Sequence, residues 1–129
     1  MKVSIIMGSD SDWPILKPAY ELLKKFDIEA EVIVASAHRT PARVKEIVTT
    51  APERGVCAFI SAAGAAAHLG GVIASYTTLP VIGVPINATA LNGMDALLST
   101  VQMPSGIPVA TMAINGAKNA AIFVVEMFA

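Results

Sequence analysis

The chain has 129 residues and a formal net charge of −1, and 54% of its residues are hydrophobic whereas only 15% are charged. No basic stripe is interleaved with aromatic residues, which argues against a nucleic-acid partner. The most apolar stretch, residues 56–75, is interrupted by His68 and several glycines, so it lacks the roughly 20 continuous apolar residues of a membrane span.

Apolar runs and helical patterns alternate along the whole chain. The runs predict strands over residues 3–7, 31–35, 58–60, 81–84 and 108–112. The patterns that follow them predict helices over residues 12–26, 41–54, 66–77, 93–102 and 117–128. Continuously apolar strands that alternate with helices are typical of a parallel sheet covered on both faces. We therefore expect a single domain over residues 1–129, a three-layer α/β/α sandwich with a flavodoxin-like five-stranded parallel sheet.

Formal charges are nearly missing from a long part of the sequence. Asp95 is the only one between Arg54 and Lys118. A small monomer cannot bury so much apolar sequence, so we expect copies of the chain to associate in a homo-oligomer. The sequence enters a predicted strand at once and shows no signal peptide, which predicts a cytoplasmic protein.

A polar cluster follows the second predicted strand. Residues 36–41 read Ser-Ala-His-Arg-Thr-Pro, after an apolar run that predicts a buried strand. The carboxyl ends of parallel strands form the ligand-binding edge of open α/β sheets. Ser36, His38 and Arg39 bring to that edge a hydroxyl, a group that titrates near neutral pH and a planar anion-binding guanidinium. The cluster therefore indicates chemistry on a phosphorylated small molecule.

A second polar segment, Gly-Ser-Asp-Ser-Asp at residues 8–12, links the first predicted strand to its helix. Such residues either cap a helix or bind a phosphate, and the sequence leaves both interpretations open. Because the first two strands are neighbours in the doubly wound order, we expect the two polar segments to meet. Ser9, Ser36 and Arg39 would then hold a phosphate. Asp12 would accept hydrogen bonds from sugar hydroxyls, which leaves His38 to carry protons.

The third predicted strand ends in a run of very small residues, 61–71, which includes Gly64. Small residues leave room for a flat ligand and expose backbone amides. His68 lies within this run, and it either has a structural role or orients a carboxylate of the ligand.

Other phosphate and nucleotide sites lack parts that they require. The sequence has neither a Gly-x-Gly-x-x-Gly fingerprint nor a Walker loop. Asp10 and Asp12 resemble the acidic pair of a phospho-receiver domain, but the third strand ends at Ser61 instead of an aspartate. No spacing of histidines supports a metal site.

Taken together, the motifs resemble those of a known family, the class I N5-carboxyaminoimidazole ribonucleotide mutases of purine biosynthesis. The matching stretches cover nearly the whole chain: Met-Gly-Ser-Asp-Ser-Asp-Trp at residues 7–13, the cluster at 36–41, Ala-Ala-His-Leu at 66–69, Leu-Pro-Val-Ile-Gly-Val-Pro at 79–85 and Ser-Thr-Val-Gln-Met-Pro at 99–104. The resemblance implies a cofactor-free isomerase that moves a carboxyl group from the exocyclic nitrogen to carbon 4 of an aminoimidazole ribonucleotide. It also implies an octamer with sites near subunit boundaries.

The resemblance further implies which residues form the site. His38 would be the catalytic residue and shuttle the proton, without a metal. The other matching positions would bind substrate: Ser9, Asp12, Ser36, Arg39, Gly64, His68 and Leu69. Among these, Ser9, Asp12 and Arg39 match residues that hold the ribose phosphate. Residues 64–69 match the loop that holds the carboxyl group.

The third loop departs from the family pattern, Gly-Ala-Gly-Gly-Ala-Ala-His-Leu-Pro-Gly. Ala62 and Ala65 stand where the family has glycines, and Gly70 stands in place of the proline. A methyl group costs about 1 kcal/mol or more where such a glycine has a positive φ or touches the ligand. The sequence also lacks the family's usual C-terminal helix, which helps subunits to pack. Two alternatives to a mutase therefore stay open: an aminoimidazole ribonucleotide carboxylase that uses free carbon dioxide, and a catalytically impaired relative that acts as a binding or assembly scaffold.

Overall fold

Five parallel strands form the central layer of the computed structural model, which describes all residues from Met1 to Ala129. The strands are β1 (Lys2–Met7), β2 (Glu29–Val34), β3 (Val56–Gly64), β4 (Val81–Ile86) and β5 (Ala110–Thr111). Their order in the sheet is β2-β1-β3-β4-β5, and every pair of neighbours is parallel. This is the flavodoxin-like order of a doubly wound sheet. The predicted fold class is confirmed.

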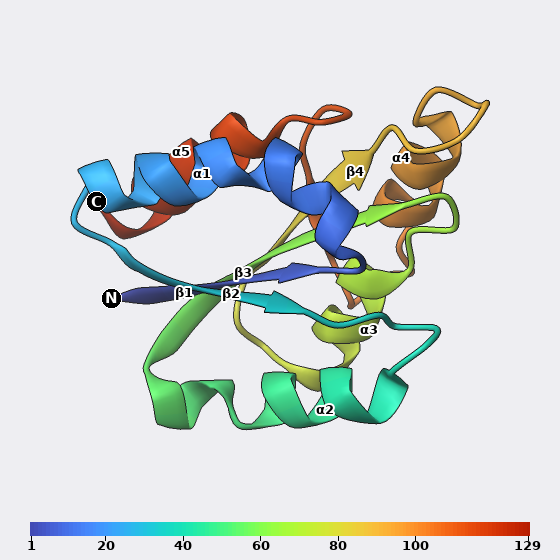
Figure 1. The fold of residues 1–129 in the computed structure, drawn as a ribbon. Coiled ribbons are helices and arrows are strands. Elements are labelled where there is room, and N and C mark those ends of the chain that lie inside the picture. Colours follow the sequence, from blue (N-terminus) through green and yellow to red (C-terminus); the bar gives the residue numbers. More distant parts are fainter.

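Helices cover both faces of the sheet (Figure 1). One face carries α1 (Trp13–Lys25) and α5 (Ala117–Phe128). The other carries α2 (Pro41–Thr49), α3 (Leu69–Tyr76) and α4 (Met94–Val101). Short 3₁₀ turns precede α1 and follow α2, namely η1 (Asp10–Asp12) and η2 (Ala51–Arg54). None of these helices has the length and apolarity needed to cross a membrane.

The two faces of the sheet hold separate hydrophobic cores. Successive side chains of a strand point to opposite faces, so Ile5 packs in the core beneath α1 and α5 while Ile6 packs in the core above α2 and α3. Both side chains are fully buried. Burial of one such aliphatic side chain stabilises the fold by about 1.5–3 kcal/mol. Continuous apolar strands are therefore the expected sequence for this sheet.

The second strand corrects one expectation. Its apolar run predicted a buried strand, but Val32 is 37% exposed and Val34 is 43% exposed. The reason is the strand order, because β2 is an edge strand whose only neighbour is β1. An apolar run alone does not distinguish a central strand from an edge strand.

Several predicted boundaries also shift. The helix predicted over 41–54 divides into α2 and η2, because Pro52 lacks an amide hydrogen and disfavours helical geometry at Ala51. The helix predicted over 66–77 begins only at Leu69, and β3 extends to Gly64 instead of ending at residue 60. The strand predicted over 108–112 is reduced to the two residues of β5.

The carboxyl ends of the strands lie at the end of the molecule opposite both chain termini (Figure 1). The turns after β1, β2 and β3 meet at that end, and the order β2-β1-β3 makes them neighbours. The fold thus collects the polar segments after the first two strands and the small-residue segment after the third.

Candidate active site

A cavity of about 340 Å³ lies at the carboxyl ends of β1, β2 and β3. Its volume falls within the range of small-molecule sites, roughly 300–1,000 Å³. The structure brings every predicted site residue to its lining: Ser9, Asp12, Ser36, His38, Arg39, Gly64, His68 and Leu69. Their location is thereby known, whereas the role of each one stays a prediction.

The turn after β1 is organised by hydroxyl groups. Ser9 has an extended backbone and caps η1, because its Oγ accepts a hydrogen bond from the amide of Ser11 at 3.3 Å. The Ser9 and Ser11 hydroxyls also share a hydrogen bond of 2.9 Å. Both of these residues line the cavity. Ser9 therefore caps this turn, and its hydroxyl also lies at the cavity, so the phosphate-binding interpretation stays a prediction.

Asp12 supplies a carboxyl group that is poorly hydrated. The residue is only 7% exposed. Burial raises the pKa of its carboxyl, a backbone hydrogen bond at Ser9 opposes this effect, and repulsion from Asp10 adds to it. A carboxylate with so little access to water gains more from hydroxyl donors on a ligand than an exposed one does.

The turn after β2 is braced by short-range hydrogen bonds. The Ser36 hydroxyl accepts from the Arg39 amide at 3.1 Å. The Ser36 amide donates to the Thr40 hydroxyl at 2.9 Å, and that hydroxyl donates back to the Ser36 carbonyl at 3.1 Å. These bonds fix the backbone on both sides of His38, so the imidazole extends from a defined turn.

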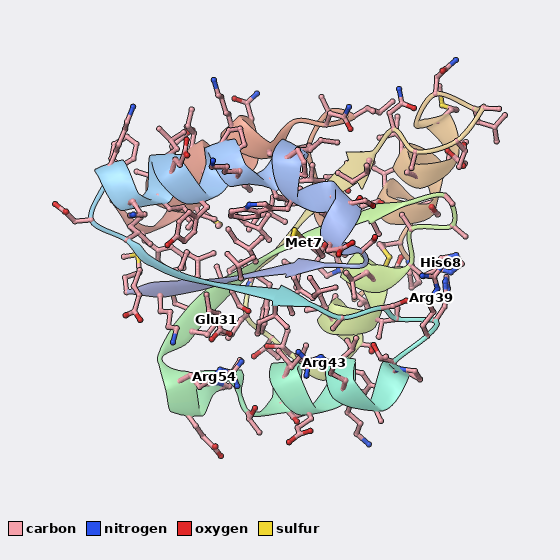
Figure 2. All side chains as sticks on the ribbon, viewed as in Figure 1. Met7, Glu31, Arg39, Arg43, Arg54 and His68 are labelled. Carbon is pink, nitrogen blue, oxygen red and sulfur yellow. The ribbon has the colours of Figure 1, made fainter.

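Arg39 is the cation of the cavity. No ion pair of the chain involves it. Arg43, one turn further along, instead donates from Nε to the Val34 carbonyl at 3.3 Å and does not line the cavity. Figure 2 shows Arg39 beside His68 at one end of the molecule, whereas the ion pair of Glu31 and Arg54 lies toward the other end. A free guanidinium at a cavity can bind a phosphate or carboxylate through two parallel hydrogen bonds.

Two histidines meet at the edge of the cavity. His38 Nε2 lies 2.8 Å from His68 Nδ1, although the residues are 30 positions apart in the sequence. The ring planes are nearly perpendicular, at 84°, with centroids 5.0 Å apart. Both side chains are exposed. Nothing in the sequence predicted this contact.

The loop after β3 is held by α4. The Ala67 amide donates to the Ser99 hydroxyl at 2.8 Å, and that hydroxyl donates to the Asp95 carbonyl at 2.7 Å. Gly64 approaches the segment after β4 so closely that a Cβ at this position would lie 2.6 Å from the Cβ of Ala88. Ser99 therefore supports the cavity without lining it, although the sequence had assigned it no role.

The departures from the family pattern have different structural consequences. Ala65 has a left-handed backbone with φ of +53°, so the methyl group there carries the strain that was expected if the family glycine had a positive φ. Ala62 is buried in β3 and has no positive φ. At Gly70, a Cβ would lie 2.9 Å from the Ser61 hydroxyl, so this packing favours glycine.

Seven further residues line the cavity, of which Gly8 and Ser11 belong to the polar segment 8–12 and Ala65 and Ala66 to the loop 64–69, both already expected at the site. Gly8, Ser11, Ala37, Ala63, Ala65, Ala66 and Ala88 complete the wall. Ala88 follows β4, the neighbour of β3. The rule that strand ends carry the ligand site could have found it. No group of three or more His, Cys, Asp or Glu residues is arranged to hold a metal ion.

Comparisons with known proteins agree over nearly the whole chain. A family model described as AIR carboxylase matches residues 2–129. A curated relative from Pyrococcus abyssi, named N5-carboxyaminoimidazole ribonucleotide mutase, is 59% identical over 126 residues, which are 98% of this chain and 72% of the relative. A relative of the same name from Thermotoga maritima is 58% identical over 121 residues, 94% of this chain and 71% of the relative. The crystal structure of Treponema denticola PurE has a TM-score of 0.86 and 29% identity, and the match covers 98% of this chain and 79% of that chain.

Proposed function

The chain belongs to the AIR carboxylase family, and from this premise we propose that it is an isomerase of purine biosynthesis. It moves the carboxyl group of N5-carboxyaminoimidazole ribonucleotide from the exocyclic nitrogen to carbon 4 of the imidazole ring. The observation that carries this proposal is the high identity, over nearly the entire chain, to relatives that bear the name of this mutase. The cavity supports it, because it contains an acid–base group and anion-binding groups together.

The reaction breaks the bond between the exocyclic nitrogen and the carboxyl carbon, forms a new bond from that carbon to carbon 4, and moves one proton. The bond between the exocyclic nitrogen and the carboxyl carbon breaks, carbon dioxide leaves, and the nitrogen keeps the electron pair and takes up a proton. Carbon 4 of the electron-rich ring then attacks the carbon dioxide, forms the new carbon–carbon bond and loses its own proton. His38 gives the first proton and takes back the second, so the enzyme ends the cycle unchanged.

The remaining groups hold the nucleotide. Arg39 binds the phosphate through its free guanidinium, and the hydroxyls of Ser9 and Ser36 add donors to the phosphate oxygens. Asp12 accepts hydrogen bonds from the ribose hydroxyls. The loop from Gly64 to Leu69 surrounds the carboxyl group with small side chains and backbone amides.

Retention of carbon dioxide is the second task of the site. Carbon dioxide that escapes from the cavity is diluted into solvent, whereas carbon dioxide held beside carbon 4 reacts at a very high effective concentration. Walls of alanine and glycine, such as Ala63 and Gly64, leave room for a flat ring, and a bound ring would displace water from the space beside it.

A mutase assay on the purified full chain, with and without added bicarbonate, tests the proposed function. We expect turnover of N5-carboxyaminoimidazole ribonucleotide that does not depend on bicarbonate. A requirement for bicarbonate and the uncarboxylated ribonucleotide would select the carboxylase instead. Ligand binding without turnover would select the scaffold. His38→Asn should abolish turnover while ligand still binds, and retained turnover would remove His38 as the proton carrier.

We further propose that the enzyme acts as a homo-oligomer, an octamer as the resemblance implies, in the cytoplasm. Four apolar side chains in and just before α4 are exposed at helical spacing: Leu91, Met94, Leu98 and Val101. A second copy of the chain would bury this stripe. Light scattering should therefore show a large assembly, and Leu98→Glu should reduce its size. A stable wild-type monomer would contradict the proposal, and imaging of the tagged chain in cells tests the location.

A further inference from the structure

The rings of His38 and His68 form a hydrogen bond at the edge of the cavity. From it we infer that His68 is a positioning residue, which accepts a hydrogen bond from Nε2 of His38 and thereby fixes the tautomer and the orientation of that imidazole. The inference rests on the proposed function, because it concerns the proton carrier of that reaction. It differs from the predicted role of His68 as a ligand for the carboxyl group of the substrate.

The distance restricts the protonation of the pair. At 2.8 Å, only one of the two facing nitrogens carries a hydrogen, since two N–H groups would repel each other. If His38 donates through Nε2, both neutral rings carry their hydrogen on Nε2. If His68 donates through Nδ1, both rings carry it on Nδ1. Neutral histidine in water prefers the Nε2–H form, so the first arrangement keeps both rings in their preferred tautomer.

This arrangement leaves one nitrogen of His38 for chemistry. Its Nε2 is occupied by His68, so the nitrogen that exchanges a proton with substrate is Nδ1. A hydrogen bond on the far nitrogen sets which nitrogen is protonated and prevents rotation of the ring. The protonated form of His38 also donates to His68, and such charge-assisted hydrogen bonds are the stronger kind. His68 thus stabilises the protonated form of His38, which donates the proton to the exocyclic nitrogen.

The geometry of the chain supports a positioning role. His38 extends from the braced turn at Ser36 and His68 immediately precedes α3, so the hydrogen bond joins the turn after β2 to the segment before α3. The only other charged groups that line the cavity are Asp12 and Arg39. Neither of them forms a hydrogen bond with a histidine ring.

Two variants of His68 separate positioning from simple substrate binding. His68→Ala removes the acceptor, whereas the amide of His68→Asn places a polar atom near the former position of Nδ1. The side chain is exposed, so both variants should fold. We expect His68→Ala to lower kcat by about 10- to 100-fold with little change in KM, the size of effect seen when a metal-ligating histidine loses the partner that orients it. His68→Asn should recover a large part of that loss.

A spectroscopic measurement tests the hydrogen bond without turnover. The chain contains only two histidines, so full-length protein labelled with 15N in histidine gives few ring signals, and His68→Asn assigns those of His38. Ring 15N shifts report directly which nitrogen carries the hydrogen. Above neutral pH, we expect His38 of the free wild-type protein to be entirely in the Nε2–H form. In His68→Ala we expect a mixture of both tautomers.

A tautomer mixture in the wild type, or a wild-type tautomer that survives in His68→Ala, overturns the inference. A higher KM with unchanged kcat in His68→Ala also overturns it and restores the role of a substrate ligand. The two proposals can also fail separately. If the mutase assay shows no turnover but His38 has a single tautomer that depends on His68, the proposed function is refuted and the hydrogen bond between the rings stands.

Discussion

The backbone conformation of Ala65, in the loop that lines the cavity after β3, allows a quantitative test. Its φ of +53° lies in the left-handed region, where an L residue with a Cβ is strained by about 1–2 kcal/mol. The variant Ala65→Gly removes that strain. Glycine also gives the unfolded chain more freedom, which offsets about 0.4–1 kcal/mol of the gain. We therefore expect a net stabilisation of about 0.5–1 kcal/mol.

Thermal unfolding at a fixed protein concentration measures this gain. An unfolding entropy of about 2.1 cal/mol/K per residue makes 1 kcal/mol equivalent to about 4 °C for a chain of this length. Ala65→Gly should then raise Tm by about 2–4 °C. A fixed concentration is needed because association of subunits would otherwise shift Tm by mass action.

The neighbouring alanine provides the matched control. Ala66 is also exposed and also lines the cavity, but it has no positive φ. Ala66→Gly gains flexibility in the unfolded chain with no strain to relieve, so it should lower stability by about 0.4–1 kcal/mol. If both variants lower Tm equally, the left-handed backbone at Ala65 does not strain the native structure.

The remaining predictions concern the anion site, the ion pair on β2 and the support of the loop. Arg39→Ala should weaken binding of the phosphorylated ligand, measured by calorimetry, by about 1.5–3 kcal/mol. Arg43→Ala should leave the affinity unchanged. Equal affinities for the wild type and both variants would contradict the phosphate role of Arg39. Burial by itself would raise the pKa of Glu31, but two hydrogen bonds from Arg54 and the nearby positive charges lower it overall. The pair therefore stabilises the fold fully above the unfolded-state pKa near 4.3 and loses this effect as pH falls through the lower folded pKa. Glu31→Gln should be less stable than wild type by about 1 kcal/mol at pH 7, with the gap closing in acid; a gap in urea unfolding that does not vary with pH would refute this. Ser99→Ala leaves the buried Ala67 amide without its partner, so it should cost about 1–3 kcal/mol and weaken ligand binding, whereas Ser75→Ala on exposed α3 surface should be neutral.

The order of elements could be predicted because it depends on local patterns. Apolar runs predict the strands, and the helical patterns between them predict the helices. The helix α5 has the bounds that its pattern predicts. The predicted ends of strands and helices were wrong where a contact with a segment distant in the sequence decides them. The extension of β3 to Gly64 depends on pairing with β4, which continues to Ile86 and supplies the partner for that residue.

The candidate site could be predicted in composition but not in geometry. Strand ends carry ligand sites in this type of sheet, so Ser9, His38 and Arg39 could be grouped from their positions after predicted strands. The structure places them around one cavity. The support of the loop by Ser99 could not be predicted, because it joins residues from different units of the fold.

The sequence by itself determined the alternation of strands and helices, the parallel sheet and the chemical inventory at its carboxyl edge. These follow from periodicity and from residue type, which are local properties. Only the tertiary structure decided that Val32 and Val34 of β2 are exposed, that Ala65 has left-handed geometry and that the imidazoles of His38 and His68 form a hydrogen bond. Each of these depends on where distant segments meet, and the packing of the complete chain sets that arrangement.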